Sequence, residues 1–180
     1  KVNPLIGTKN IWFLHGRTTP FVTPPFGMTH WTPQTRNSRI NELSYYYRDN
    51  YIIGFRGSHK PAKWMGDYGY VGMMPGIDEI KTLSEERKLK FRHRKEVSKP
   101  HYYSVDLKAN SGKSIKSEVT ATERCGILRF TFPQNEKPHL IIEASQNPDF
   151  DGWIKVDADK GEIIGYNADR NSAITGPEVP

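Results

Sequence analysis

The chain has 180 residues, of which 36% are hydrophobic and 12% aromatic, with one cysteine and a formal net charge of +6. This length suits one domain, and one cysteine excludes an internal disulfide or a cysteine-rich zinc site. No apolar run is long enough for a transmembrane helix, so we expect no membrane span. No signal peptide is visible, so we expect that any targeting segment was removed or lies outside these residues.

The first forty residues contain five prolines and few strand-like runs, which predicts a long ordered loop system. Long irregular segments in compact domains are often functional. Residues 45–55 are rich in β-forming residues, and residues 69–74 predict a further short strand. Residues 78–90 are the nearest candidate for a helix, but their apolar positions are too sparse to form a stripe.

The second half of the chain carries clearer strand signals. Tyr103, Val105 and Leu107 alternate with polar residues, as expected for a strand with one buried face. Alternation or short apolar runs predict strands at residues 101–107, 114–122, 126–132 and 139–144, with a hairpin from 152–157 and 161–167. Many short strands separated by turn residues predict an all-β fold, either a sandwich or a barrel.

Seven basic residues lie between Arg87 and Lys99, against the carboxylate of Glu96 alone. Such a stretch is usually the solvated face of a strand or loop. No nucleic-acid-binding motif accompanies it, so we expect no nucleic-acid partner. A nucleic-acid-binding β domain is an alternative hypothesis, which requires steeply salt-dependent binding to unrelated oligonucleotides.

Residues 53–75 combine side chains that are typical of sugar sites with closely spaced glycines. Aromatic rings stack on the apolar face of a pyranose, His, Arg and Asp bond its hydroxyl groups, and glycines let the backbone approach a ligand. The side chains of these types are Arg56, His59, Trp64, Asp67 and Tyr68. A loop packed on its own aromatic rings is the alternative, and composition alone favours it.

Single residues of this region also have structural interpretations. His59 could be a hydrogen-bonded structural histidine, and Asp67 could cap a turn. Tyr45, Tyr46 and Tyr47 are consecutive, so on a strand at least one of them faces the opposite side, which favours an exposed aromatic platform.

Glycoside hydrolysis needs two carboxylates, one as acid and one as base or nucleophile. The sequence contains no carboxylate pair that stands out, no metal cluster with convincing ligand spacing, no Ser–His–Asp arrangement and no phosphate-binding loop. We therefore predict a binding surface without catalytic residues of its own.

An ordered set of short motifs runs through about the first three-quarters of the chain. They are VNPLIGT at 2–8, PPFGM at 24–28, TPQT at 32–35, GDYG at 66–69, YYSVDL at 102–107, EVTAT at 118–122 and RFTFP at 129–133, with Tyr45, Tyr47, Asp49, His59, Phe91, His93 and Glu96 between them. Each motif is weak alone, but in this order they resemble the N-terminal domain of glycoside hydrolase family 92.

The resemblance implies an antiparallel β-sandwich at residues 1–180, whose natural end we expect beyond residue 180, and a catalytic (α/α)₆ barrel that is absent from these residues. Members of the family are exo-α-mannosidases that invert configuration with the aid of calcium. The acid and base carboxylates and the calcium ligands are expected on the barrel, so the isolated domain should be inactive. The expected partners are α-mannoside glycans and the barrel of the same polypeptide, and the expected location is secreted, periplasmic or cell-surface.

The resemblance also implies that rings in this domain stack on the sugar and that polar groups bond its hydroxyls. The expected substrate-binding residues are Phe26, Gly27, Arg56, His59, Trp64, Gly66 and Asp67. Arg56 stands where the family usually has serine, and basic residues around it lead to the hypothesis of an acidic or otherwise decorated glycan. The alternative function is a stand-alone, non-catalytic carbohydrate-binding sandwich, which would be indicated by a gene product that stops near Pro180.

Overall fold

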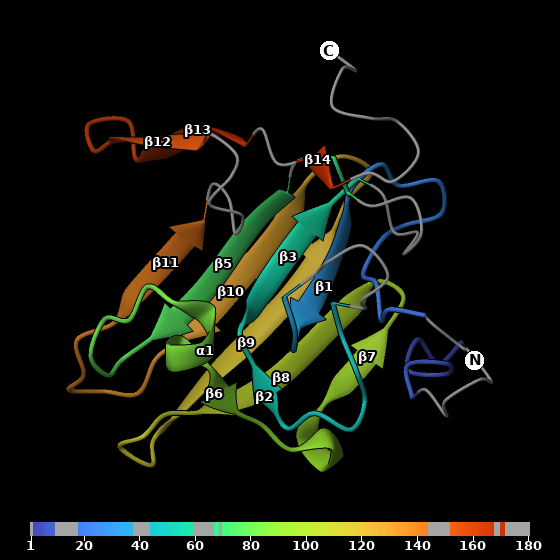
Figure 1. Cartoon of the computed structure of the whole chain (residues 1–180), viewed down its shortest axis with the longest axis horizontal. Helices are drawn as coiled ribbons and strands as arrows, with labels where there is room; N and C mark the ends of the chain where they lie inside the picture. The colour runs from blue at the N-terminus through green and yellow to red at the C-terminus, as the bar shows by residue number, and fades with distance from the viewer. Residues whose placement is uncertain are drawn as a thin grey trace.

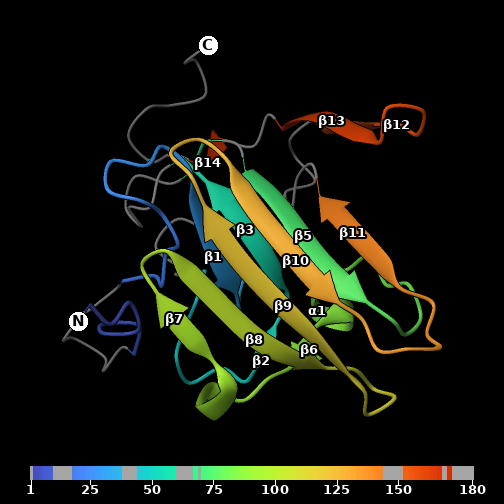
Figure 2. The same cartoon turned by 180° about the vertical axis from the view of Figure 1, so that it is seen from behind.

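The computed structural model describes residues 2–9, 18–37, 44–59, 67–68, 70–143, 152–167 and 170–171, and two antiparallel sheets pack face to face in it (Figures 1 and 2). One sheet has the order β1-β3-β5-β11, with β1 (His30–Gln34), β3 (Gly54–Ser58), β5 (Tyr70–Gly76) and β11 (His139–Glu143). The other has the order β10-β9-β8-β6-β2, with β10 (Gly126–Thr131), β9 (Ser114–Ala121), β8 (Tyr102–Lys108), β6 (Leu89–Lys90) and β2 (Tyr51–Ile52), and β7 (Val97–Lys99) pairs with β8. The predicted antiparallel β-sandwich is confirmed.

Smaller elements surround the two sheets. Strand β12 (Gly152–Asp157) pairs with β13 (Glu162–Asn167) as a hairpin, and β4 (Asp67–Tyr68) pairs with β14 (Arg170–Asn171). The helix α1 (Ser84–Arg87) lies against the four-stranded sheet near β6 in Figure 1, and a 3₁₀ turn covers His93–Lys95. Among the described residues, no helix has the length and apolar character that a membrane crossing requires.

Alternating apolar side chains from both sheets fill the interior. On β8, Tyr103, Val105 and Leu107 are buried, as their alternation predicts. The ring of Phe55 on β3 crosses to the opposite sheet, where its centroid lies 6.4 Å from that of Tyr103 and 5.8 Å from that of Phe130. Because aromatic rings bury large areas, these contacts compensate for the low hydrophobic fraction of the chain.

Trp31 on β1 lies against glycines of both sheets. A Cβ at Gly126 on β10 would lie 2.1 Å from Trp31 Nε1, and a Cβ at Gly57 on β3 would lie 2.9 Å from Trp31 Cζ2. Neither position has room for a Cβ beside the indole. The close approach of Trp31 to Gly126 brings β1 and β10 together across the sandwich.

The β12–β13 hairpin exposes apolar side chains on both of its faces. Trp153 and Tyr166 lie opposite each other in the ladder and are each 51% exposed, and Val156 on the other face is 66% exposed. The amide of Asn167 donates a 2.7 Å hydrogen bond to the carbonyl oxygen of Tyr70 on β5. A two-stranded hairpin is marginally stable alone, and this hydrogen bond ties its last residue to the sandwich.

Three sequence interpretations need correction. The proline-rich first forty residues include a strand, β1, in which Pro33 is tolerated because β1 is an edge strand. Residues 45–47 lie in a loop and form no exposed aromatic platform. Tyr45 is fully buried, and the half-buried rings of Tyr46 and Tyr47 pack against Arg36 and His93. Arg87 of the basic stretch is not solvated; it is buried and pairs with Glu143 on β11 at 2.7 Å.

Candidate functional site

Pro24 to Gly27 form a tight turn that holds an aromatic ring in solvent. The amide of Gly27 donates a 3.0 Å hydrogen bond to the carbonyl oxygen of Pro24, and Phe26 between them has φ of 63° and is 98% exposed. Glycine adopts this left-handed conformation freely, whereas a residue with a Cβ loses about 1 kcal/mol there. Backbone strain of this kind gathers at functional sites, which makes Phe26 the first candidate for a ligand contact.

The turn is fixed to one end of the six-stranded sheet. A Cβ at Gly27 would lie 2.2 Å from Thr23 Oγ1 and 3.1 Å from the carbonyl oxygen of Pro24, so this position favours glycine. The amide of Thr23 donates to the carbonyl of Pro100 at 2.9 Å, and that of Met28 donates to the carbonyl of Glu123 at 2.7 Å. Because these carbonyls lie in the turns that precede β8 and β10, the exposed ring is held by ordered backbone on both sides.

His59 joins this turn from the end of β3. Its side chain is exposed, and its Nδ1 lies 3.3 Å from the carbonyl oxygen of Met28. A proton on Nδ1 serves this contact and leaves Nε2 as an acceptor for a hydroxyl group. The structure thus brings His59 to the turn that carries Phe26 and Gly27, three of the residues that the sequence singled out.

Arg56 lies on the face of the four-stranded sheet that points away from the other sheet. It is 1% exposed, and its guanidinium carbon lies 3.6 Å from the ring centroid of Tyr70, a cation–π contact. Its cross-strand neighbour on β1 is Thr32, also buried. Arg56 is therefore packed in a buried polar layer, and its contact with a sugar stays a prediction.

The remaining expected site residues are described only in part. The backbone of Asp67 lies in β4 opposite Asn171 of β14. The Asp67 side chain, Trp64 and Gly66 lie outside the described residues.

The sequence interpretation missed most of the polar layer around Arg56. Thr32 and Gln34 on β1, Ser58 on β3 and Tyr70 on β5 are all buried. The signal was present, because Thr32 and Gln34 alternate with Trp31 and Pro33, but the prolines around them favoured a loop.

Other motif residues meet in a partly buried cluster beside the loop at residues 44–50. His93 Nδ1 lies 2.7 Å from Glu96 Oε2, and His93 Nε2 lies 3.0 Å from the carbonyl oxygen of Asp49. The ring of Tyr47 stacks on the imidazole with centroids 4.2 Å apart. Each of these groups is occupied by another protein group, so this cluster orders the loop at residues 44–50 and is not a ligand site.

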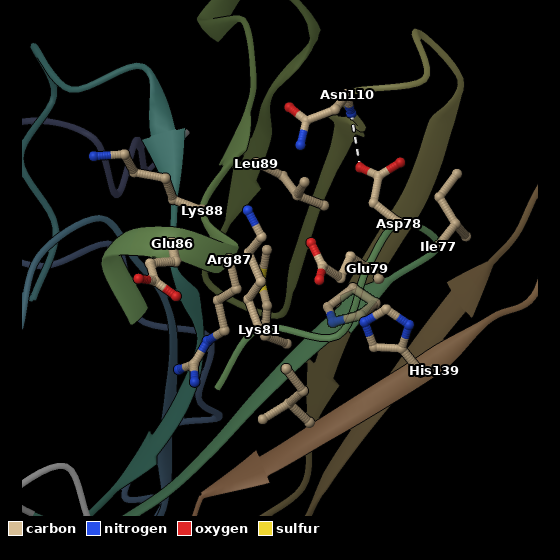
Figure 3. Close-up of a pocket in the computed structure, with 14 residues that line it drawn as sticks. Ile77, Asp78, Glu79, Lys81, Glu86, Arg87, Lys88, Leu89, Asn110 and His139 are labelled. Atoms are coloured by element: carbon tan, nitrogen blue, oxygen red, sulfur yellow. Dashed lines mark hydrogen bonds between the residues drawn. The ribbon is translucent and has the colours of Figure 1, made fainter. Parts of the chain in front are cut away.

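A cavity of about 100 Å³ between β5, α1 and β11 gathers several charged side chains (Figure 3). Asp78 there accepts a 2.8 Å hydrogen bond from the amide of Asn110, which Figure 3 marks with a dashed line. The guanidinium of Arg87 bonds Glu143 and the carbonyl oxygen of Thr82. No Phe, Tyr or Trp side chain lines the described cavity, so it lacks the broad stacking surface of a sugar site. The bonds of Asp78 and Arg87 serve the fold.

The described carboxylates are too dispersed for a calcium site. Calcium takes six to eight oxygen ligands, several of them carboxylates. Within the described ranges, no group of three or more His, Cys, Asp or Glu side chains could hold a metal ion. The described part of the chain therefore does not fit the calcium ion that the resemblance implies.

Comparisons with known proteins place the chain in a family. A family model described as the glycosyl hydrolase family 92 N-terminal domain matches residues 1–178. The structure is similar to the family GH92 inverting mannosidase BT2199 from Bacteroides thetaiotaomicron VPI-5482, with a TM-score of 0.79 and 34% identity, over 92% of this chain and 22% of that one. It is also similar to the family GH92 α-mannosidase BT3965 from Bacteroides thetaiotaomicron, with a TM-score of 0.66 and 27% identity, over 79% of this chain and 20% of that one.

No curated protein matched the chain. The chain spans about a fifth of the length of the solved structures that it matches. The family model covers all but the last two residues, and the two antiparallel sheets agree with the sandwich that the motifs implied. This chain belongs to glycosyl hydrolase family 92, as an N-terminal domain of that family.

Proposed function

We propose that this chain is the substrate-contacting N-terminal domain of an inverting exo-α-mannosidase that hydrolyses terminal α-mannosides of glycans. Membership of the family and the mannosidase activity named for its solved relatives support the reaction. The observation that carries the substrate contact is Phe26, a 98% exposed ring in a strained turn that backbone hydrogen bonds fix on both sides.

Each expected site residue receives a role in this proposal. The ring of Phe26 stacks on the apolar face of the terminal sugar, and Gly27 lets the backbone turn closely beneath it. Nε2 of His59 accepts a hydrogen bond from a sugar hydroxyl. Arg56, whose guanidinium packs against the ring of Tyr70, contributes positive charge to the site. The site is completed by Trp64, Gly66 and Asp67.

The bond-breaking groups of this proposal lie elsewhere in the whole protein. Inverting hydrolysis needs a carboxylic acid that protonates the leaving oxygen and a carboxylate that activates water, about 6.5–9.5 Å apart. We propose that a catalytic barrel of the same polypeptide supplies both, together with the calcium ligands, and that this domain alone is inactive. We propose further that the protein is secreted, periplasmic or cell-surface.

Kinetics of point variants in the whole protein test the substrate contact. We expect Phe26→Ala and His59→Ala each to lower kcat/KM for a neutral α-mannobiose by at least about tenfold, which corresponds to about 1.4 kcal/mol of lost transition-state stabilisation. Tyr166→Ala is the matched control, because Tyr166 is a half-exposed ring on the β12–β13 hairpin. Activity unchanged in both site variants would contradict a sugar contact at this turn.

A further inference from the structure

A second concave surface lies on the outer face of the six-stranded sheet, built from β6, the 3₁₀ turn, β8 and the start of β9. It is a groove of about 290 Å³. The charged and polar side chains that line it are Lys90, Arg92, Lys95, Asp106, Lys108 and Ser114. Four of them are cationic and one is a carboxylate, so the groove carries a concentrated positive charge.

The one carboxylate of this lining is already engaged. Asp106 Oδ2 lies 3.1 Å from the ammonium of Lys95. Within the described ranges, Lys90, Arg92 and Lys108 have no carboxylate partner. Three cations of the groove therefore form no ion pair with a described carboxylate of the protein.

Two of these cations face each other directly. Lys90 on β6 and Lys108 on β8 are cross-strand partners in the ladder. Side chains directly opposite in an antiparallel pair have Cβ atoms about 4.5–5.5 Å apart, and like charges at such positions destabilise the pair. An anion bound between the two ammonium groups would reverse that repulsion into attraction.

We propose that this groove binds a saccharide that carries carboxylate or sulfate groups, and so docks the protein on an anionic glycan apart from the mannose site. The guanidinium of Arg92 suits planar or tetrahedral oxyanions, which it can bond with two N–H groups. The hydroxyl of Ser114 can bond a sugar hydroxyl beside the charge. The choice of a saccharide rests on the proposed glycosidase function.

Other polyanions fit the groove less well. Proteins that bind single-stranded nucleic acid combine positive charge with exposed rings on which bases stack. The aromatic side chain that lines this groove, Phe91, is 2% exposed and offers no such surface. A bilayer presents a broad surface, whereas the cations here converge on a concave groove about as large as the smaller ligand pockets.

Calorimetry on the whole protein with defined hexasaccharides tests the proposal. The probes are hexagalacturonate for carboxylates and a heparin-derived hexasaccharide for sulfates, with neutral α-mannohexaose and a hexanucleotide as comparisons. We expect at least one anionic saccharide to bind, to bind less tightly as salt is raised, and to bind at least about tenfold more tightly than the neutral hexamer and the hexanucleotide.

Paired variants locate the binding. Lys90→Ser with Lys108→Ser should weaken that binding by at least about tenfold. Lys99→Ser with Lys155→Ser removes the same charge outside the groove lining and should change it less than about twofold. The proposal is overturned if neither anionic saccharide binds, if the hexanucleotide binds more tightly, or if both double variants behave alike.

The same samples separate this proposal from the mannosidase proposal. Hydrolysis of a neutral α-mannobiose by the whole protein reports the mannosidase alone, and the groove variants should retain it. Activity without binding of the anionic hexasaccharides would refute only the groove, whereas binding without activity would refute only the mannosidase.

Discussion

The hydroxyl of Tyr103 donates a 2.6 Å hydrogen bond to the carboxylate of Glu96, whose side chain has no exposed surface. Tyr45 donates to the same carboxylate at 2.8 Å, and His93 Nδ1 lies 2.7 Å from its other oxygen. Burial, and secondarily the charge of Glu96, raises the pKa of Tyr45 and of Tyr103 well above the usual value for tyrosine. Both hydroxyls therefore stay protonated and act as donors to the buried carboxylate.

Replacing this carboxylate by an amide should weaken the fold. In Glu96→Gln, an NH₂ donor would replace one of the two carboxylate oxygens. It would then face the hydroxyl or imidazole donors that bond this carboxylate in the wild type. Hydrogen bonds to a charged group contribute about 1.5–3 kcal/mol each, so we expect a loss of about 3 kcal/mol in the free energy of unfolding. Urea denaturation measures it, with Glu85→Gln as control, because Glu85 is 65% exposed and pairs with Lys88 on the surface. Equal stability of the two variants would contradict a structural role for the Glu96 cluster.

Stability should depend on acid through Glu118 on β9. Hydrogen bonds from the guanidinium of Arg129, the larger cause, and from the hydroxyl of Tyr102 lower the pKa of Glu118 to about 2. Because the folded pKa lies below the unfolded value of about 4.3, this contribution is fully present above about pH 4.3 and is lost as the pH falls towards 2. We expect the free energy of unfolding to fall between about pH 4.3 and pH 2. It should fall less steeply in Arg129→Met, which lacks the guanidinium. The same acid slope in both proteins would contradict this assignment.

The contact between Trp31 and Gly126 should not tolerate a methyl group. In Gly126→Ala the new Cβ would lie 2.1 Å from Trp31 Nε1, so the buried indole or β10 must move. Overpacking of this kind costs about 1–3 kcal/mol, and we expect that loss in denaturation together with altered tryptophan fluorescence. Thr131→Ala, at the exposed end of β10, should stay within about 0.5 kcal/mol of the wild type. A stable Gly126→Ala with unchanged fluorescence would show that the two sheets do not approach at this point.

Phe26 should matter for activity and little for stability. Phe26→Gly relieves the left-handed strain but gives the unfolded chain more freedom, so the free energy of unfolding should change by less than about 1 kcal/mol. The core substitution Phe55→Ala should cost about 3–5 kcal/mol. Thermal denaturation and kcat/KM on a mannoside, measured together, test this contrast. A loss of stability in Phe26→Gly as large as in Phe55→Ala would make Phe26 a packing residue.

Most of the sandwich could be predicted from local alternation. Ile115, Ser117 and Val119 on β9 point inward as their period of two requires, and the strands between residues 101 and 167 lie within two residues of their predicted bounds. The short strand β14 was not predicted. β1 was missed because Pro33 argues against a strand unless the strand is known to lie at a sheet edge. That knowledge depends on long-range pairing, which no local window contains.

The candidate site was only partly predictable. His59 lies at the turn that carries Phe26, and this arrangement depends on the carbonyl of Met28, which sequence spacing does not reveal. Tyr45 and Arg56 carry polar groups that favour solvent, and both are buried because specific partners, Glu96 and the ring of Tyr70, receive them. Such pairings across sheets and loops are settled by the fold and leave no periodic signal.

The most direct test of the proposed function is hydrolysis of α-mannobiose isomers by the whole protein and by the isolated 180 residues, each with and without a calcium chelator. We expect the whole protein to release mannose with inverted anomeric configuration, the chelator to abolish that activity, and the isolated residues to release none. Absence of activity on every α-mannoside, or hydrolysis by the 180 residues alone, would contradict the proposal that this domain binds substrate for a mannosidase whose carboxylates lie on another part of the polypeptide.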